Sequence, residues 1–83
     1  MKTVATNHAP AALGPYAQAQ ISGGFVFTSG QIGIDPATGA FPATIEEQTR
    51  QSLTNCKAVL EAAGAAMENV IKTTVFLSDM NNF

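Results

Sequence analysis

The residues best suited to bind a ligand lie in the segment 28–36, where a run typical of a buried strand gives way to small residues. A glycine at a strand end lets a ligand reach main-chain N–H and C=O groups, and Gly30 follows Ser29 at such a position. The Ser29 hydroxyl is suited to orient a polar ligand. The segment lacks the spacing of a phosphate-binding loop, so no nucleotide site is predicted. The sequence also offers no histidine that can be placed beside Ser29, so no Ser-His-Asp triad is predicted.

The other reactive side chains give weaker signals. His8 is the single histidine, and no second ligand lies near it at metal-binding spacing, so we predict no metal site. Cys56 is the single cysteine and lies between Leu53 and Leu60 of a helical apolar pattern, where a thiol is usually an inert, buried hydrophobe. Tyr16 is the single tyrosine, and its glycine- and proline-containing surroundings favour a pocket wall and a packing role equally.

Composition limits the class of protein. Hydrophobic residues make up 46% of the chain and charged residues only 12%, against about 25% charged residues in a typical soluble domain. There are too few charged residues to cover the surface of a monomer. This favours an oligomer, whose interfaces would bury part of the apolar surface. The net charge of −2 and the four scattered basic residues argue against nucleic acid. The absence of a signal peptide pattern, of a membrane-length apolar run and of a cysteine pair predicts a soluble, cytoplasmic protein with no membrane partner.

Strands are predicted around the candidate ligand segment. Residues 18–22 and 25–29 flank two glycines, a pattern typical of a β-hairpin. Residues 1–5 are suited to an edge strand, and residues 35–39 contain the aspartate, proline and glycine of a tight turn. Residues 70–78 are rich in β-branched side chains and are predicted to form a further strand.

One helix is well marked. Thr44 followed by Glu47 predicts a capping box at its start, and Gly64 predicts its end. Ser78 or Asp79 offers the cap of a second helix that has only a few residues behind it, too few to be stable alone. We therefore expect residues 1–83 to be a single α+β domain that is incomplete at its C-terminus, with a helix on a mostly antiparallel sheet.

Three blocks of this sequence, taken together, closely resemble the RidA/YjgF family of reactive-intermediate deaminases. These blocks are residues 11–18, residues 28–39 and residues 70–77, and the helical stretch from Gln48 to Gly64 is also similar. The resemblance implies a chorismate-mutase-like fold with helices on one face of the sheet, built as a homotrimer with ligand pockets between subunits. It also implies hydrolysis of reactive 2-imino acids and enamines, such as 2-iminobutanoate and 2-iminopropanoate, to 2-keto acids and ammonia without a metal or organic cofactor.

The resemblance also assigns site residues. Tyr16, Ser29, Gly30 and Phe83 are implied to bind substrate, whereas no catalytic residue is identified. Family members hold the substrate carboxylate with an arginine in a Pro-Ala-Arg segment, and a later glutamate assists the attacking water; both would lie beyond Phe83. Arg50 is the single arginine here, and its helical position matches no such role. We therefore expect this 83-residue chain to lack deaminase activity by itself.

Two other functions remain open at this point. A non-catalytic, small-molecule-binding regulatory trimer would use the same pocket, because the family includes members without the arginine. A ribonuclease or translation inhibitor, an activity attributed to relatives, is disfavoured by the acidic balance and by the lack of aromatic residues with basic neighbours.

Overall fold

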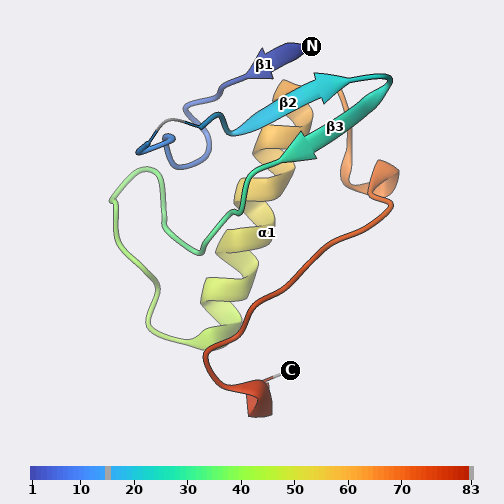
Figure 1. The fold of residues 1–83 in the computed structure, drawn as a ribbon. Helices are drawn as coiled ribbons and strands as arrows, with labels where there is room; N and C mark the ends of the chain where they lie inside the picture. The colour runs from blue at the N-terminus through green and yellow to red at the C-terminus, as the bar shows by residue number, and fades with distance from the viewer. Residues whose placement is uncertain (15, 83) are drawn as a thin grey trace.

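The computed structural model describes residues 1–14 and 16–82 of the chain, which form a small sheet covered on one face by a helix (Figure 1). Strands β1 (Lys2–Val4), β2 (Ala19–Ser22) and β3 (Phe25–Thr28) pair antiparallel in the order β1-β2-β3. Helix α1 (Ile45–Ala62) follows, and the short 3-10 helices η1 (Met67–Asn69) and η2 (Met80–Asn82) come last. The predicted α+β class is confirmed.

The β2–β3 hairpin forms where the glycine pair predicts it. Gly23 and Gly24 have φ angles of 58° and 81°, a left-handed conformation that few other residues adopt without strain. The turn sets the register, with Ser22 opposite Phe25 and Ala19 opposite Thr28. Strand β1 pairs with the free edge of β2, so the predicted edge strand is also confirmed.

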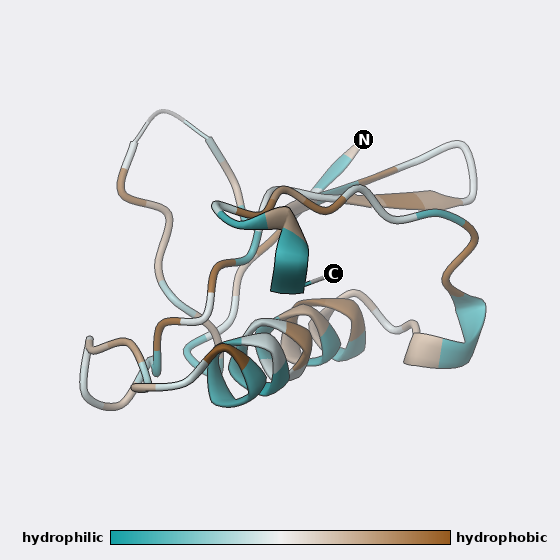
Figure 2. Ribbon diagram, turned by 90° about the horizontal axis from the view of Figure 1, so that it is seen from below, coloured by the Kyte–Doolittle hydropathy of each residue, from teal (hydrophilic) through white to brown (hydrophobic). Residues whose placement is uncertain are grey.

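The core lies between the sheet and α1, which appear as two layers in Figure 2. Val4, Ala19 and Val59 are buried there, and Ile21 and Val26 pack against them from neighbouring strands. Because side chains alternate between the two faces of a strand, the residues on either side of Val26 point away from α1. They are Phe25 and Phe27, which are 55% and 62% exposed and whose ring centroids lie 6.2 Å apart.

Helix α1 begins and ends at the predicted residues. The Thr44 side-chain oxygen accepts a hydrogen bond of 3.1 Å from the Glu47 N–H, which caps the first turn. At the other end Gly64 has a φ of 83° and its N–H donates to the Glu61 carbonyl. The buried side of the helix differs from the expected apolar pattern, because Leu53 is half exposed whereas the polar Asn55 is fully buried.

The strand predicted over residues 70–78 is wrong for the structure described. A strand needs hydrogen bonds to a neighbouring strand, and after η1 the chain runs back toward the N-terminal end of α1, away from the β1–β3 sheet (Figure 1). Its large apolar side chains are therefore exposed, with Ile71 at 83% and Phe76 at 91%. The Asp79 carboxylate accepts the Asn81 N–H at 3.0 Å and caps η2, as predicted for this position.

None of the helices described is both long and apolar enough to cross a membrane.

Candidate functional site

Ser29 follows the last residue of β3 and is held by Gln18, the residue before β2, and by Gln31. Its N–H donates to the Gln18 carbonyl at 2.9 Å, and its hydroxyl donates to the same oxygen at 3.2 Å. The Gln31 side-chain amide donates to the Ser29 Oγ at 3.3 Å. Ser29 is partly buried, so its hydroxyl is both oriented by the protein and near the surface.

The two glycines of the segment have different roles. Gly30 is exposed, and a Cβ added there would meet nothing within 4 Å, so a ligand can approach its backbone. Gly33 is buried, and a Cβ there would lie 2.5 Å from the Gln48 carbonyl oxygen of α1. Close packing of the segment against α1 therefore requires glycine at position 33, whereas only Gly30 fits the expectation of backbone open to a ligand.

Polar side chains of α1 hold the segment 31–34 in place. Ser52 Oγ donates to the Gln31 carbonyl at 2.6 Å. Asn55 Nδ2 donates to the carbonyls of residues 32 and 34 at 2.9 and 2.8 Å, and its Oδ1 accepts the Gln51 amide at 2.8 Å. Sequence reasoning missed these residues, although polar side chains at positions 52 and 55, three residues apart on one face of an amphipathic helix, are the signal that would have found two of them. We call Gln51, Ser52 and Asn55 the α1 clamp.

A second buried amide, Gln18, organises the N-terminal segment. Its Oε1 accepts the Thr6 N–H, and its Nε2 donates to the carbonyls of Thr6, Ala9 and Pro10 at 3.1, 3.4 and 2.7 Å. Only 4% of Gln18 is exposed. Since its carbonyl also accepts both hydrogen bonds from Ser29, Gln18 joins the N-terminal segment to the end of β3. This residue was also missed, and no pattern in the sequence distinguishes it.

Tyr16 lines a shallow hollow of about 360 Å³ that Gln18 and parts of residues 4–12 also line. The ring is 56% exposed, and its hydroxyl accepts the Leu13 N–H at 3.4 Å. Tyr16 is therefore a surface residue that lines a depression and has no core role. Ser29 and Gly30 are adjacent, and Gln18 connects them to the Tyr16 hollow; Phe83, the fourth candidate, lies outside the described residues.

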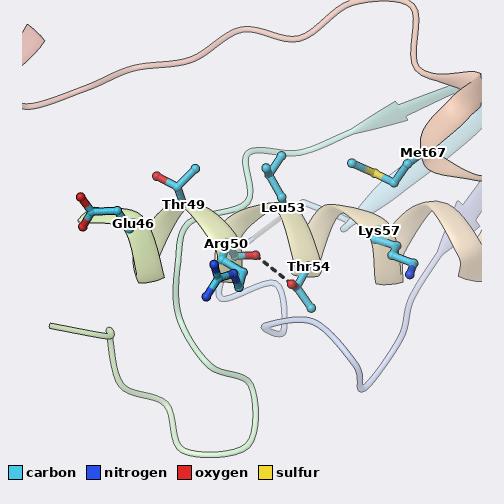
Figure 3. A pocket seen from close by; sticks show the side chains of 7 residues that line it. All are labelled: Glu46, Thr49, Arg50, Leu53, Thr54, Lys57 and Met67. Carbon is cyan, nitrogen blue, oxygen red and sulfur yellow. Dashed lines mark hydrogen bonds between the residues drawn. The ribbon is translucent and has the colours of Figure 1, made fainter. Parts of the chain in front are cut away.

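Arg50 lines a different hollow, of about 390 Å³, on α1 (Figure 3). Lys57 lies two helical turns further along, and Leu53 and Met67 supply the apolar part of the wall. Two positions along an α-helix correspond to about 200° of rotation. Because Ser52 points at the Gln31 carbonyl, Arg50 points away from the segment 31–34.

The Cys56 thiol is partly buried on α1, and burial raises its pKa because the charged thiolate is disfavoured away from water. It is thus a poor nucleophile at neutral pH. His8 is exposed, and its backbone N–H donates to Thr6 Oγ1 at 3.2 Å. Within residues 1–14 and 16–82, no three histidine, cysteine or acidic side chains gather as a metal site would require.

Comparison with known proteins shows which family shares this arrangement. The family described as "Endoribonuclease L-PSP" matches residues 6–83. The chain is 52% identical over 82 residues to the Escherichia coli K12 protein named 2-iminobutanoate/2-iminopropanoate deaminase. That match covers 99% of this chain and 64% of the relative, so the chain spans less than two thirds of the length of that relative.

Solved structures share the fold closely. The crystal structure of E. coli TdcF with bound serine matches with a TM-score of 0.96 and 48% identity, over 99% of this chain and 65% of that one. The E. coli YjgF gene product matches with a TM-score of 0.95 and 51% identity, again over 99% and 65% of the two chains. The predicted RidA/YjgF-like fold is therefore confirmed for the residues that the structure describes.

Proposed function

Because the chain belongs to the endoribonuclease L-PSP family and is 52% identical to a deaminase of E. coli, we propose that the protein hydrolyses short 2-imino acids. The products are the 2-keto acid and ammonia, and the substrates are 2-iminobutanoate and 2-iminopropanoate, as in the name of that relative. The observation that carries the proposal is the identity of 52% across almost the whole chain, together with an oriented hydroxyl beside open backbone at Ser29 and Gly30.

The chemistry asks little of the protein. Water attacks an electrophilic C=N carbon, so the site must mainly hold the imino acid and help protons to move. The Ser29 hydroxyl and the backbone at Gly30 supply polar contacts, and Tyr16 supplies an apolar wall of the hollow that Gln18 also lines. No step requires a bound metal or organic cofactor.

The substrate carboxylate needs a cationic partner, and a bidentate arginine suits it best. Arg50 points away from the segment 31–34, so it does not meet this need within one subunit. We therefore expect the 83 residues alone to turn over imines slowly or not at all.

The assembly proposed is a homotrimer with the site at a subunit boundary. The support is physical: Phe25 and Phe27 on the open sheet face and Phe76 in the unpaired segment are more than half exposed, and few charged residues are present to solvate such a surface. Sedimentation velocity of the chain at several concentrations would measure the mass of the assembly.

A direct assay tests the proposed activity. A pyridoxal-phosphate-dependent dehydratase acting on threonine releases 2-iminobutanoate, and semicarbazide traps the imine that escapes hydrolysis. We expect the full chain encoded by the gene to lower the yield of trapped imine in proportion to its concentration, and Ser29→Ala to weaken this effect. An unchanged yield at enzyme concentrations equal to those of the dehydratase would reject the deaminase.

The same assay separates the regulatory alternative, in which the pocket binds a small acid without turnover. A relative binds serine in its crystal structure, which supports small-molecule binding by proteins of this shape. Saturable binding of a 2-amino acid together with an unchanged imine yield would favour that alternative.

The family description favours RNA as a further candidate substrate. Binding to RNA depends on phosphate contacts from basic side chains, and the two basic residues that share a surface hollow here, Arg50 and Lys57, have Glu46 beside them. We expect no salt-dependent RNA binding, and a filter-binding titration at two salt concentrations checks this.

A further inference from the structure

Ser29 is oriented by hydrogen bonds that fix which way its hydroxyl can act. A serine hydroxyl has one proton to donate and two lone pairs to accept. The proton lies toward the Gln18 carbonyl, and one lone pair accepts the Gln31 side-chain amide. One acceptor position is left, so the remaining partner of Ser29 must be a donor.

The orientation of Gln31 is fixed in turn from α1. Ser52 Oγ donates to the Gln31 carbonyl at 2.6 Å, the shortest contact of the α1 clamp, while Asn55 holds the next carbonyls of the same segment. The Gln31 side chain is partly buried and extends back along the chain to Ser29. Hydrogen bonds therefore link Ser52 to the main chain of Gln31, the side chain of Gln31 to Ser29, and Ser29 to the carbonyl of Gln18.

The amide end that Gln31 presents follows from this series. A carbonyl oxygen such as that of Gln18 only accepts, so the hydroxyl proton is directed there. The group on the other side of the Ser29 oxygen must then donate, which is what the Nε2 of Gln31 does. If Gln31 lost its donor, only the Gln18 carbonyl would hold the hydroxyl proton, and the hydroxyl could turn from that carbonyl to donate to a ligand.

We propose that Gln31 is a positioning residue that holds the Ser29 hydroxyl as a hydrogen-bond acceptor for an N–H group of the ligand. This proposal rests on the proposed function and deepens it, because an imino acid carries an N–H on its reacting carbon whereas its 2-keto product carries only an oxygen acceptor there. The site would thus hold the nitrogen of the substrate and release the keto acid.

Two stable ligands test the distinction. 2-Aminobutanoate carries N–H donors at the position of the imine nitrogen, and 2-oxobutanoate carries an acceptor oxygen. Affinities of both are measured by calorimetry with the full chain encoded by the gene. Gln31→Met keeps the length of the side chain and removes its donor. We expect this substitution to lower the affinity for 2-aminobutanoate about tenfold, the effect of roughly one hydrogen bond to a charged group. The affinity for 2-oxobutanoate should change less than about twofold.

A double-mutant cycle separates positioning from a general structural effect. In a Ser29→Ala background the Gln31→Met change should have no further effect on 2-aminobutanoate, because Gln31 acts through the hydroxyl. Gln20→Met is the matched control, since Gln20 is also an amide that donates to a hydroxyl, that of Thr3 at 2.9 Å, but lies on β2. It should leave both affinities unchanged.

The outcomes are decisive in both directions. Equal weakening of the two ligands, additive effects of the two substitutions, or failure of the unchanged chain to bind 2-aminobutanoate would each overturn the proposal. Imine hydrolysis is measured separately. A chain that binds both ligands as expected but does not hydrolyse imines would reject the deaminase and support the role of Gln31. A chain that hydrolyses imines normally but binds the two ligands without selectivity would support the deaminase and reject the role of Gln31.

Discussion

Replacement of Asn55 by alanine is the strongest test of how the candidate site is held. The Asn55 side chain is fully buried and makes three hydrogen bonds of 2.8 to 2.9 Å, two of them to carbonyls of the segment 31–34. Asn55→Ala removes all three and leaves two carbonyl groups without their donor.

The magnitude follows from these contacts. Each hydrogen bond contributes a net 0.5–1.5 kcal/mol or so, and an unsatisfied buried group adds to the loss, so we expect about 3 kcal/mol of destabilisation. A domain of this size has a total stability of roughly 4–12 kcal/mol at about 0.05–0.15 kcal/mol per residue. The expected loss is therefore a large fraction of the whole, and it corresponds to a fall in Tm of roughly 12–24 °C.

Urea denaturation followed by circular dichroism measures this loss. Asn55→Ala should lower the midpoint with little change in the m value, as a change in stability alone does. Gln51→Ala removes only the bond to Asn55 Oδ1 and should cost about 1 kcal/mol. Asn81→Ala, at an exposed position, should stay within about 0.5 kcal/mol of the unchanged chain. A loss of less than about 1 kcal/mol for Asn55→Ala would refute the clamp as the support of the segment.

Three further predictions concern single positions. Gly33→Ala places a Cβ against the α1 backbone and should destabilise the chain by about 1–3 kcal/mol in the same urea assay, whereas Gly30→Ala should be nearly neutral because the space there is open; equal effects would contradict the two roles assigned to these glycines. Thr44→Ala removes the cap of α1 and should cost about 1 kcal/mol, seen as a lower helical signal and a fall in Tm of roughly 4–8 °C, and no change would mean that the cap does not stabilise the helix. The thiol of Cys56 should react with iodoacetamide more slowly in the folded chain than in urea. Because its folded pKa is raised by burial, its contribution to stability is present below the ordinary thiol pKa and is lost as the pH rises through the raised value; a stability that increases over that alkaline range would contradict this sign.

Local signals explain which elements the sequence predicts. The glycine pair at 23–24, the cap at Thr44 and the stop at Gly64 each depend on the conformation of a few consecutive residues, so they could be read without knowing the fold. The strand predicted at 70–78 depends instead on a partner strand, and none of the described segments provides one. The β-branched composition of residues 70–78 favours a strand locally, but a strand forms only when a neighbouring strand pairs with it.

The candidate site divides in the same way. Residue types alone single out Ser29 and Gly30, and the close match of the chain to its family assigns them a substrate class as a proposal. Residue types do not distinguish the role of Gly30 from that of Gly33, since both are glycines in the same segment. Only the distance from Gly33 to α1 shows that one glycine serves packing and the other leaves backbone open.

The amino-acid sequence by itself therefore determined the local conformations, the fold class and the position of the candidate ligand segment, because those depend on short-range preferences and on periodicity. The tertiary structure alone decided the support of that segment, since Asn55 and Gln18 are ordinary amides until folding buries them against carbonyls distant in sequence. It also decided the orientation of the Ser29 hydroxyl, which depends on the carbonyl of Gln18 and on the side chain of Gln31, whose own main chain is held by α1. Burial makes each of these hydrogen bonds obligatory, and only the folded chain determines which groups are buried together.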